Sequence, residues 1–287
     1  MNIIDIYKKK ENKSKMILLF VMLALLFILF YFWETKNKNN LETDKIIDVY
    51  FLKLNEADSN IIKYKNKLII IDTGEEKHKN IIQTKLEQLK ISKIDYMILS
   101  HPDKDHIGSA KYLIEKFEVE NIIQSHFKKG SNLQKELDKV IADSNVNNII
   151  LNETKEITID DLKFTLIPGN EETYKEDNDY SLVALMHYFN NNFFFGADIE
   201  ETRIEEVLKL NLTNYDVVKI PHHGRYNPLS ISLLELLKPK YAIITAGSTD
   251  NRILAKLGDL NTDFHFTKNY EVNIKCDGNN FVLERID

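Results

Sequence analysis

The sequence predicts an α/β protein in which two sheets pack face to face with helices outside, an αββα sandwich, preceded by one N-terminal transmembrane helix. Two observations predict this fold class. Near the N-terminus, residues 16–33 form an apolar run of eighteen residues without a charge. From residue 46 onward, strand patterns come first and mixed strand and helix patterns follow, and this order occurs twice. Two such layered halves are expected to share one core.

Composition and charge set wide limits on function. The chain has 287 residues, of which 43% are hydrophobic and 29% charged, so it can bury a sizeable core. Its formal net charge of -6 gives no strong field, and nothing in the composition indicates a surface built for a polyanion. Cys276 is the only cysteine, which excludes an internal disulfide and a cysteine-rich zinc cluster. Any metal site must therefore use His, Asp and Glu.

The apolar run from Met16 to Trp33 predicts a membrane anchor. As a helix it would reach roughly 27 Å, close to the hydrocarbon thickness of a bilayer. Charged residues before it are mainly lysines, whereas residues 34–45 mix both signs. This bias places residues 1–15 in the cytoplasm and the chain after residue 34 outside the membrane. A cleaved signal peptide is the alternative, but no small-x-small cleavage site follows the run.

Residues 34–45 are polar, rich in asparagine and without periodicity, which predicts a linker. A single domain over residues 46–287 is then expected. Its first half begins with a small antiparallel meander of β-branched runs and continues with alternating helix and strand patterns. The strands are expected at 46–54, 60–64, 67–71, 96–99 and 121–123, and the helices at 78–89 and 109–117.

The second half repeats this plan. Four strand patterns come first, and helices and strands then alternate to residue 245. The strands are expected at 156–159, 162–167, 181–188, 193–195, 217–220 and 241–245, and the helices at 200–208 and 230–237.

The segment Ser-His-Pro-Asp-Lys-Asp-His-Ile-Gly, residues 100–108, carries four potential metal ligands within six residues, directly after a predicted strand: His101, Asp103, Asp105 and His106. A turn at a strand end can aim alternate side chains at one point, and imidazole with carboxylate suits a zinc- or manganese-type ion. The alternative is a solvated loop in which Asp105 or His106 serves the start of the next helix.

Two further segments also follow predicted strands. The adjacent His222 and His223 lie in Pro-His-His-Gly, and because neighbouring side chains diverge in extended backbone, each would serve a different ion. Asp198 follows an apolar strand at Gly196, where a bridging carboxylate would be needed, although a helix N-cap is the more common use of such an aspartate. Asp72, at the end of another strand, is interpreted as a turn residue.

These segments, in this order, resemble the metallo-β-lactamase superfamily and especially its ComEC-like hydrolase branch. The resemblance covers about residues 46 to 285 and rests on five segments: 48–62, Ile-Asp-Thr-Gly at 71–74, the loop 101–108, Asp198, and Pro-His-His-Gly at 221–224. It implies the αββα metallo-β-lactamase sandwich and a dinuclear centre of two divalent ions, zinc first and manganese as the alternative. Asp105 and Asp198 are expected to act in catalysis as well as in metal binding.

Two departures from the family pattern bear on the ligands. Asp103 stands where the family usually has a histidine, and the usual additional histidine is missing around residues 178–181. The ligand set is similar to that of the phosphorylcholine esterase of teichoic acids. The resemblance then implies that His101, Asp103 and one downstream histidine hold the first ion, that Asp105, His106 and the other hold the second, and that Asp198 bridges.

The resemblance favours a membrane-anchored phosphodiesterase whose extracytoplasmic domain cleaves nucleic acid or a cell-envelope phosphodiester such as teichoic acid. Hydrolysis of an ester, thioester or lactam is a second possibility, since a fold does not determine its substrate. A non-catalytic, membrane-tethered metal-binding or scaffold protein is a third, and the missing histidine favours it. Cations lining the cleft would separate these hypotheses, with Arg225, Lys128 and Lys129 as the candidates.

Overall fold

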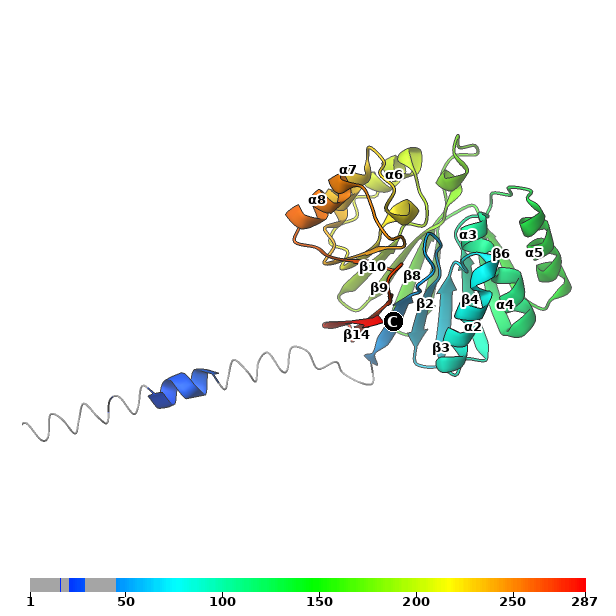
Figure 1. Cartoon of the computed structure of the whole chain (residues 1–287). Coiled ribbons are helices and arrows are strands. Elements are labelled where there is room, and N and C mark those ends of the chain that lie inside the picture. The colour runs from blue at the N-terminus through cyan, green and yellow to red at the C-terminus, as the bar shows by residue number, and fades with distance from the viewer. Residues whose placement is uncertain (1–15, 17–20, 29–44) are drawn as a thin grey trace, which may run out of the picture.

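The computed structural model describes residues 16, 21–28 and 45–287, and residues 45–287 form two sheets packed face to face with helices on both outer faces (Figure 1). The predicted αββα sandwich is therefore confirmed. The predicted anchor lies largely outside the described residues, of which residues 21–28 are helical. Within the described part of the chain, no helix is long and apolar enough to cross a membrane.

The first sheet has eight strands in the order β15-β14-β1-β2-β3-β4-β5-β6. Strands β1 to β3 form the expected antiparallel meander, and β3 to β6 run parallel. The C-terminal hairpin returns to pair with β1, where Val49 lies opposite Ile274. The strands are β1 (Ile47–Phe51), β2 (Asn60–Tyr64), β3 (Lys67–Ile71), β4 (Lys93–Leu99), β5 (Glu118–Ser125), β6 (Asn147–Leu151), β14 (Glu271–Cys276) and β15 (Phe281–Ile286).

The second sheet has seven strands in the order β13-β12-β11-β10-β9-β8-β7. Strands β7 to β10 are antiparallel and β10 to β13 are parallel, so this sheet repeats the change of direction seen in the first. The strands are β7 (Lys155–Ile159), β8 (Leu162–Ile167), β9 (Val183–Tyr188), β10 (Asn191–Phe195), β11 (Val217–Lys219), β12 (Tyr241–Ile244) and β13 (Asp263–Phe266).

Apolar side chains on both faces of each sheet divide the interior into three layers. One cluster fills the space between the sheets, and one lies under the helices of each half. The helices of the first half are α2 (Lys79–Gln88), the short α3 (Lys104–Ile107), α4 (Ala110–Lys116) and α5 (Asn132–Asp143), and those of the second are α6 (Glu201–Leu208), α7 (Ser230–Leu237) and α8 (Asn251–Asp259). Three 3₁₀ turns lie at Glu76–His78, Asp177–Tyr180 and Pro221–Gly224.

Candidate metal centre

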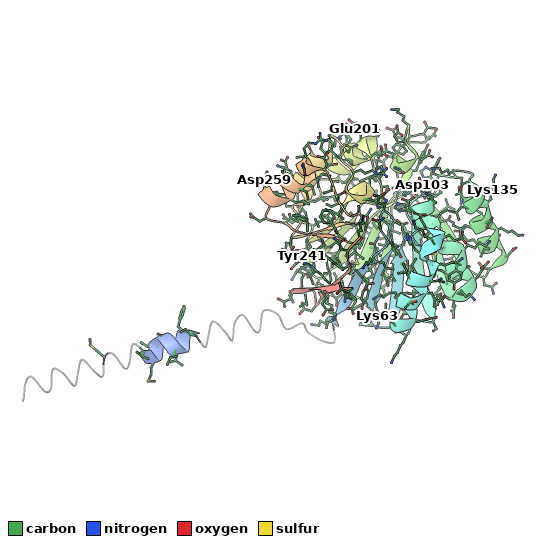
Figure 2. The ribbon with its side chains drawn as sticks, viewed as in Figure 1. Lys63, Asp103, Lys135, Glu201, Tyr241 and Asp259 are labelled. Carbon is green, nitrogen blue, oxygen red and sulfur yellow. The ribbon has the colours of Figure 1, made fainter. Side chains whose placement is uncertain are left out.

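The predicted ligands follow strands of both sheets at one end of the sandwich. The loop that carries His101 follows β4, Asp198 follows β10, and the His222–His223 pair follows β11. The carboxyl ends of parallel strands meet at one edge of a sheet, where α/β proteins place their ligand sites. In Figure 2, Asp103 lies at this end of the domain, and Lys63, in the β2–β3 hairpin, lies at the other.

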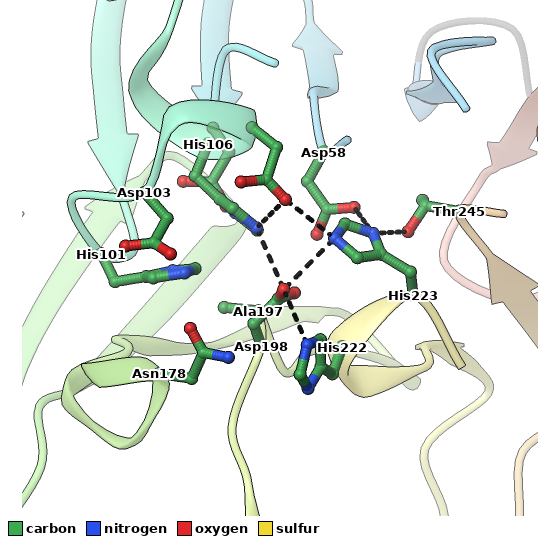
Figure 3. Close-up of polar contacts among 12 residues, drawn as sticks. Asp58, His101, Asp103, His106, Asn178, Ala197, Asp198, His222, His223 and Thr245 are labelled. Atoms are coloured by element: carbon green, nitrogen blue, oxygen red, sulfur yellow. Dashed lines mark hydrogen bonds and ion pairs between the residues drawn. The ribbon is translucent and has the colours of Figure 1, made fainter. Parts of the chain in front are cut away.

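Four of the predicted ligands converge on one point. The nearest donor atoms of Asp105, His106, Asp198 and His223 all lie within 4.8 Å of one another. Asp198 Oδ2 is 3.3 Å from His106 Nε2 and 3.2 Å from His223 Nε2, which is itself 3.2 Å from Asp105 Oδ2 (Figure 3). Segments more than a hundred residues apart in sequence thus supply one cluster of nitrogen and oxygen donors.

The other three predicted ligands surround this cluster at longer range. His101 stacks beside His106 with ring centroids 4.1 Å apart, and Figure 3 shows its ring directed toward Asp198. His222 Nε2 is 4.0 Å from Asp198 Oδ2, on the opposite side from His106. Asp103 accepts a hydrogen bond of 2.8 Å from Lys129, so its carboxylate has a cationic partner from the protein.

His101 and His106 are 2% and 0% exposed, so the alternative of a solvated loop is wrong. Asp198 is not a helix N-cap either, because Glu200 holds that position in α6. Asp179 accepts the backbone N–H of Glu200 at 2.7 Å instead.

Gly196 allows the close approach that its position predicts. An added Cβ there would lie only 2.7 Å from Cγ of Pro221. The absence of a side chain at Gly196 therefore lets the turn after β10 pack against the turn after β11.

His106 is oriented from behind by Asp72. Its Nδ1 donates to Asp72 Oδ2 at 2.8 Å, while the same carboxylate accepts from the backbone N–H and the hydroxyl of Ser100, each at 2.8 Å. A carboxylate behind an imidazole fixes its tautomer and directs the other nitrogen toward a metal. The interpretation of Asp72 as a turn residue therefore missed its main contact.

His223 has a comparable support. Its Nδ1 lies 2.9 Å from Thr245 Oγ1 and 3.3 Å from Asp58 Oδ1. Asp58 belongs to the loop between β1 and β2, and Thr245 follows β12, so both sheets orient this one ring. Nε2 of His223 consequently faces Asp105 and Asp198.

The turn that carries the paired histidines has an unusual backbone. His222 and His223 have φ angles of 48° and 53°, and Gly224 follows with φ of 82°. The expected extended backbone at the pair is therefore wrong. Left-handed backbone at a residue other than glycine costs roughly 1–2 kcal/mol, and such strain gathers at functional sites. Here it turns His223 into the cluster while His222 Nδ1 faces Glu200 Oε1 at 3.4 Å.

Burial and neighbouring charges set the protonation of the cluster. Burial lowers the pKa of an imidazole, but the carboxylates of Asp198 and Asp72 outweigh burial and hold the pKa of His106 well above its usual value. At His223 burial is likewise outweighed, by Asp198 and Asp58, and the pKa rises to about 10. Burial and the charge on His106 lower the pKa of His101 to about 4. Without metal, His106 and His223 are therefore cationic at neutral pH and His101 is neutral.

The carboxylates respond in the opposite sense. Burial alone would raise the pKa of Asp198, but the positive charges of His106 and His223 lower it well below its ordinary value. At Asp105 burial is outweighed by a hydrogen bond from His223, and the pKa falls to about 2. Both carboxylates are therefore anionic at neutral pH and ready to bind a cation.

The side chains present fit divalent metal ions. Imidazole nitrogens and carboxylate oxygens are the donors that zinc and manganese take. In addition, Nε2 of His101 is buried and has no hydrogen-bond partner among the described residues. Buried polar atoms are rarely left unpaired, so this nitrogen suits a metal ligand. Metal binding at His106 and His223 would release their protons.

Three contributing residues were missed by sequence reasoning: Asp58, Lys219 and Thr245. Lys219 is 1% exposed and lies beside Asp58 and Asp198. A lysine inside the otherwise apolar segment Val217–Ile220 was the available signal, because a charge in a buried strand requires a partner.

Sequence comparison relates the chain to two curated proteins. It is 28% identical over 165 residues to ComE operon protein 3 of Bacillus subtilis, covering 56% of this chain and 21% of that protein. It is 26% identical over 155 residues to Recombination protein 2 of Haemophilus influenzae, covering 54% and 18%. The predicted ComEC-like resemblance is thus confirmed at modest identity, and the chain spans about a fifth of the length of these relatives.

Solved structures share the fold. The metallo-beta-lactamase fold protein YhfI from Bacillus subtilis aligns with a TM-score of 0.55 at 10% identity, over 77% of this chain and 96% of that one. A putative metal-dependent hydrolase from Parabacteroides distasonis aligns with a TM-score of 0.50 at 16% identity, over 77% and 92%. The sequence model of the metallo-beta-lactamase superfamily matches residues 54–247, more than half of the chain. By fold, segment order and sequence match, the chain belongs to the metallo-beta-lactamase superfamily.

Proposed function

We propose that this protein is a metal-dependent hydrolase that cleaves phosphodiesters. The observation that carries the proposal is the convergence of Asp105, His106, Asp198 and His223, next to the buried and unpaired Nε2 of His101. A scaffold protein has no evident need for such a cluster. The similarity to the two curated relatives supports the ComEC-like branch. The choice of a phosphodiester over another bond rests on the resemblance of the sequence segments to that branch.

The geometry supports one division of the ligands between two ions. Asp105, His106 and His223 would hold one ion, because their donor atoms already lie together. The other would be held by His101, Asp103 and His222, for which Asp103 must exchange its bond to Lys129 for the metal. Asp198 lies between the two groups and would contact both ions.

Bound divalent ions would lower the pKa of a water molecule and stabilise negative charge on a phosphoryl oxygen. The residues of the chain then have distinct tasks. Asp198 and Asp105 stay anionic at neutral pH and hold the positive charge in place. Asp72 and Asp58 fix the rings of His106 and His223 from the outside.

One exposed cation, Arg225, lies beside the cluster. A pocket of about 160 Å³ opens beside His222, and Arg225 lines it together with Glu200. Arg225 Nη1 lies 3.2 Å from His222 Nε2 and is exposed. Lys128 instead pairs with Asp138, away from the ligands. Arg225 is therefore the cation that we expect to contact a phosphoryl oxygen of nucleic acid or teichoic acid.

We also propose that residues 16–33 anchor the protein in the cell membrane, with residues 1–15 cytoplasmic, residues 34–45 as a linker and the domain of residues 46–287 outside. The apolar run and the lysines before it support this arrangement. The apolar side chains of residues 21–28 in the helical part are exposed. Carbonate extraction of cell membranes tests the anchor: release of the full-length protein into the soluble fraction would contradict it.

The test of the proposed function combines metal content with turnover. Full-length protein in detergent should bind about two zinc or manganese ions per chain and hydrolyse bis(p-nitrophenyl) phosphate. Asp198→Ala and His223→Ala should lose turnover, whereas His187→Ala, on the exposed face of β9, should keep it.

Other outcomes decide between the remaining hypotheses. If the protein binds metal but turns over only an ester, thioester or lactam, that substrate class replaces the proposed phosphodiester. Metal binding without any turnover would favour the non-catalytic protein. Absence of bound metal under saturating zinc and manganese would overturn the metal centre itself.

A further inference from the structure

Lys219 is a charged side chain in an unusual place. It is the last residue of β11, in the interior of the second sheet, and is 1% exposed. A buried ammonium group is costly unless each of its N–H donors meets an acceptor. Lys219 Nζ donates to the backbone oxygen of Ala197 at 2.9 Å and lies 3.4 Å from Asp198 Oδ1. Its third partner is the carboxylate of Asp58, with which it forms a close ion pair.

Asp58 is the other member of this pair and comes from the opposite half of the domain. It is 1% exposed and lies in the loop between β1 and β2. Its backbone N–H donates to the carbonyl of Asp105 at 3.1 Å, and its carbonyl accepts from Gly74 N–H at 2.7 Å. Asp58 is therefore held in place by backbone bonds that do not depend on its charge.

The contacts of these side chains form a closed ring. Asp58 Oδ2 meets Lys219, and Lys219 lies beside Asp198 Oδ1. Asp198 Oδ2 is 3.2 Å from His223 Nε2, and His223 Nδ1 is 3.3 Å from Asp58 Oδ1. Each of the two carboxylates and the imidazole uses two different atoms for its two neighbours. Lys219 and Asp58 therefore restrict rotation of Asp198 and His223, both predicted metal ligands, through Asp198 Oδ1 and His223 Nδ1, which do not face the cluster.

We propose that the Lys219–Asp58 pair is a positioning device for the metal centre. Lys219 lies beside Oδ1 of Asp198, which leaves Oδ2 facing His106 and His223, and Asp58 sets the ring angle of His223. A purely structural ion pair between the sheets would need no contact with either ligand, whereas this pair touches both. The inference rests on the proposed dinuclear centre and adds two residues that would position its ligands.

The single variant Lys219→Met is a poor test, because it leaves Asp58 buried as an unpaired charge and destabilises the fold. The double variant Asp58→Asn with Lys219→Met removes both charges while keeping side-chain size, and should melt within a few degrees of wild type. We expect its affinity for Zn²⁺ to fall about 10- to 100-fold, as for other groups that orient ligands from behind. The electron paramagnetic resonance spectrum of Mn²⁺-loaded protein should change as well, because the side chains of Asp198 and His223 are no longer held in place.

The control is the Lys240–Asp216 pair, whose Nζ and Oδ1 are 2.6 Å apart. Both residues directly precede the first residues of β11 and β12, at the end of the sheet away from the metal centre. Asp216→Asn with Lys240→Met should leave metal affinity and the Mn²⁺ spectrum unchanged. If the Asp58→Asn, Lys219→Met protein keeps wild-type affinity and spectrum, the pair is purely structural. That result overturns this inference and leaves the proposed function untouched. If the wild-type protein binds neither Zn²⁺ nor Mn²⁺, the proposed function fails with it.

Discussion

Asp72 shows at the residue scale how a side chain that touches no substrate can govern the metal centre. Its carboxylate holds Nδ1 of His106 at 2.8 Å and is itself fixed by Ser100. Asp72→Asn should lower Zn²⁺ affinity by about 10- to 100-fold, because the amide no longer imposes the tautomer that frees Nε2. Isothermal titration calorimetry with Zn²⁺ measures this directly.

The control for this prediction is Asp95→Asn. Asp95 is also buried, at 3% exposure, and it accepts from Lys67 Nζ and Leu68 N–H at the other end of β4. Its replacement should cost stability and leave Zn²⁺ affinity unchanged. Equal losses of affinity in the two variants would show that Asp72 acts only through the fold.

The protonation of His223 predicts how the stability of metal-free protein depends on pH. The pKa of His223 in the folded protein, about 10, lies above the ordinary value of 6.5. Protonated His223 therefore contributes its full stabilisation of the fold below about pH 6.5, and this contribution is lost as the pH rises toward 10. Urea denaturation of EDTA-treated protein should therefore show a free energy of unfolding that falls between about pH 6.5 and pH 9. His223→Gln should flatten this dependence, and a stability that rises over the same interval would contradict the assignment.

At the element scale, the turn Pro221–Gly224 determines where both paired histidines point. Gly224 has φ of 82°, and an added Cβ would lie 2.8 Å from Thr249 Oγ1 and 2.9 Å from Ile244 Cγ2. Gly224→Ala should therefore lower the melting temperature and reduce metal affinity, because the turn must change its conformation to relieve the clash.

Gly258→Ala is the matched control for the turn. Gly258 lies inside α8, and an added Cβ would meet no atom within 4 Å. Alanine is favoured over glycine in a helix interior, so this variant should gain roughly 0.5–1 kcal/mol of stability and bind metal normally. Chemical denaturation measures the stability of Gly224→Ala and Gly258→Ala, and a zinc titration measures their metal affinity. Normal metal affinity in Gly224→Ala would show that the left-handed turn is not required.

Sequence reasoning missed α5 and β6, and also α8 and β13 to β15 after residue 245. Helix α5 is amphipathic, with Gln134, Leu137 and Ile141 buried on one face, so its sequence did carry the signal of a helix. Strand β6 is an edge strand with Ile150 41% exposed, and its alternation is blurred. Central strands such as β3 and β4 are buried on both faces and give continuous apolar runs, which is why they were predicted.

For the whole molecule, the C-terminal hairpin completes the sheet that begins with β1. Ile274 of β14 is fully buried between the two sheets. Ile274→Ala should lower the free energy of unfolding by about 2–5 kcal/mol, since it leaves a cavity in the shared core.

Ile150→Ala, on the exposed edge strand β6, serves as the control and should change stability by roughly 0.5 kcal/mol or less. Urea denaturation measures both. A small loss at Ile274 would indicate that the hairpin is not part of the cooperative unit.

The amino-acid sequence alone determined the two-layered α/β plan, and it identified the seven predicted ligands of the proposed metal centre. Strand periodicity and the density of histidine and aspartate after strands are local properties, and they can be read without knowing the fold. The alternatives of a solvated loop and an N-cap could not be excluded in this way, because burial depends on what packs over a segment. Only the structure showed that His106 is buried and that Asp198 is not a helix N-cap.

Tertiary structure alone decided how these residues are supported. Asp58 and Lys219 are 161 positions apart in sequence and meet only because the two sheets pack face to face. The left-handed turn at His222 and His223 is likewise imposed by contacts from β10 and β12, against the intrinsic preference of the residues. Orientation and protonation of the cluster follow from such long-range contacts, which no local pattern in the sequence records.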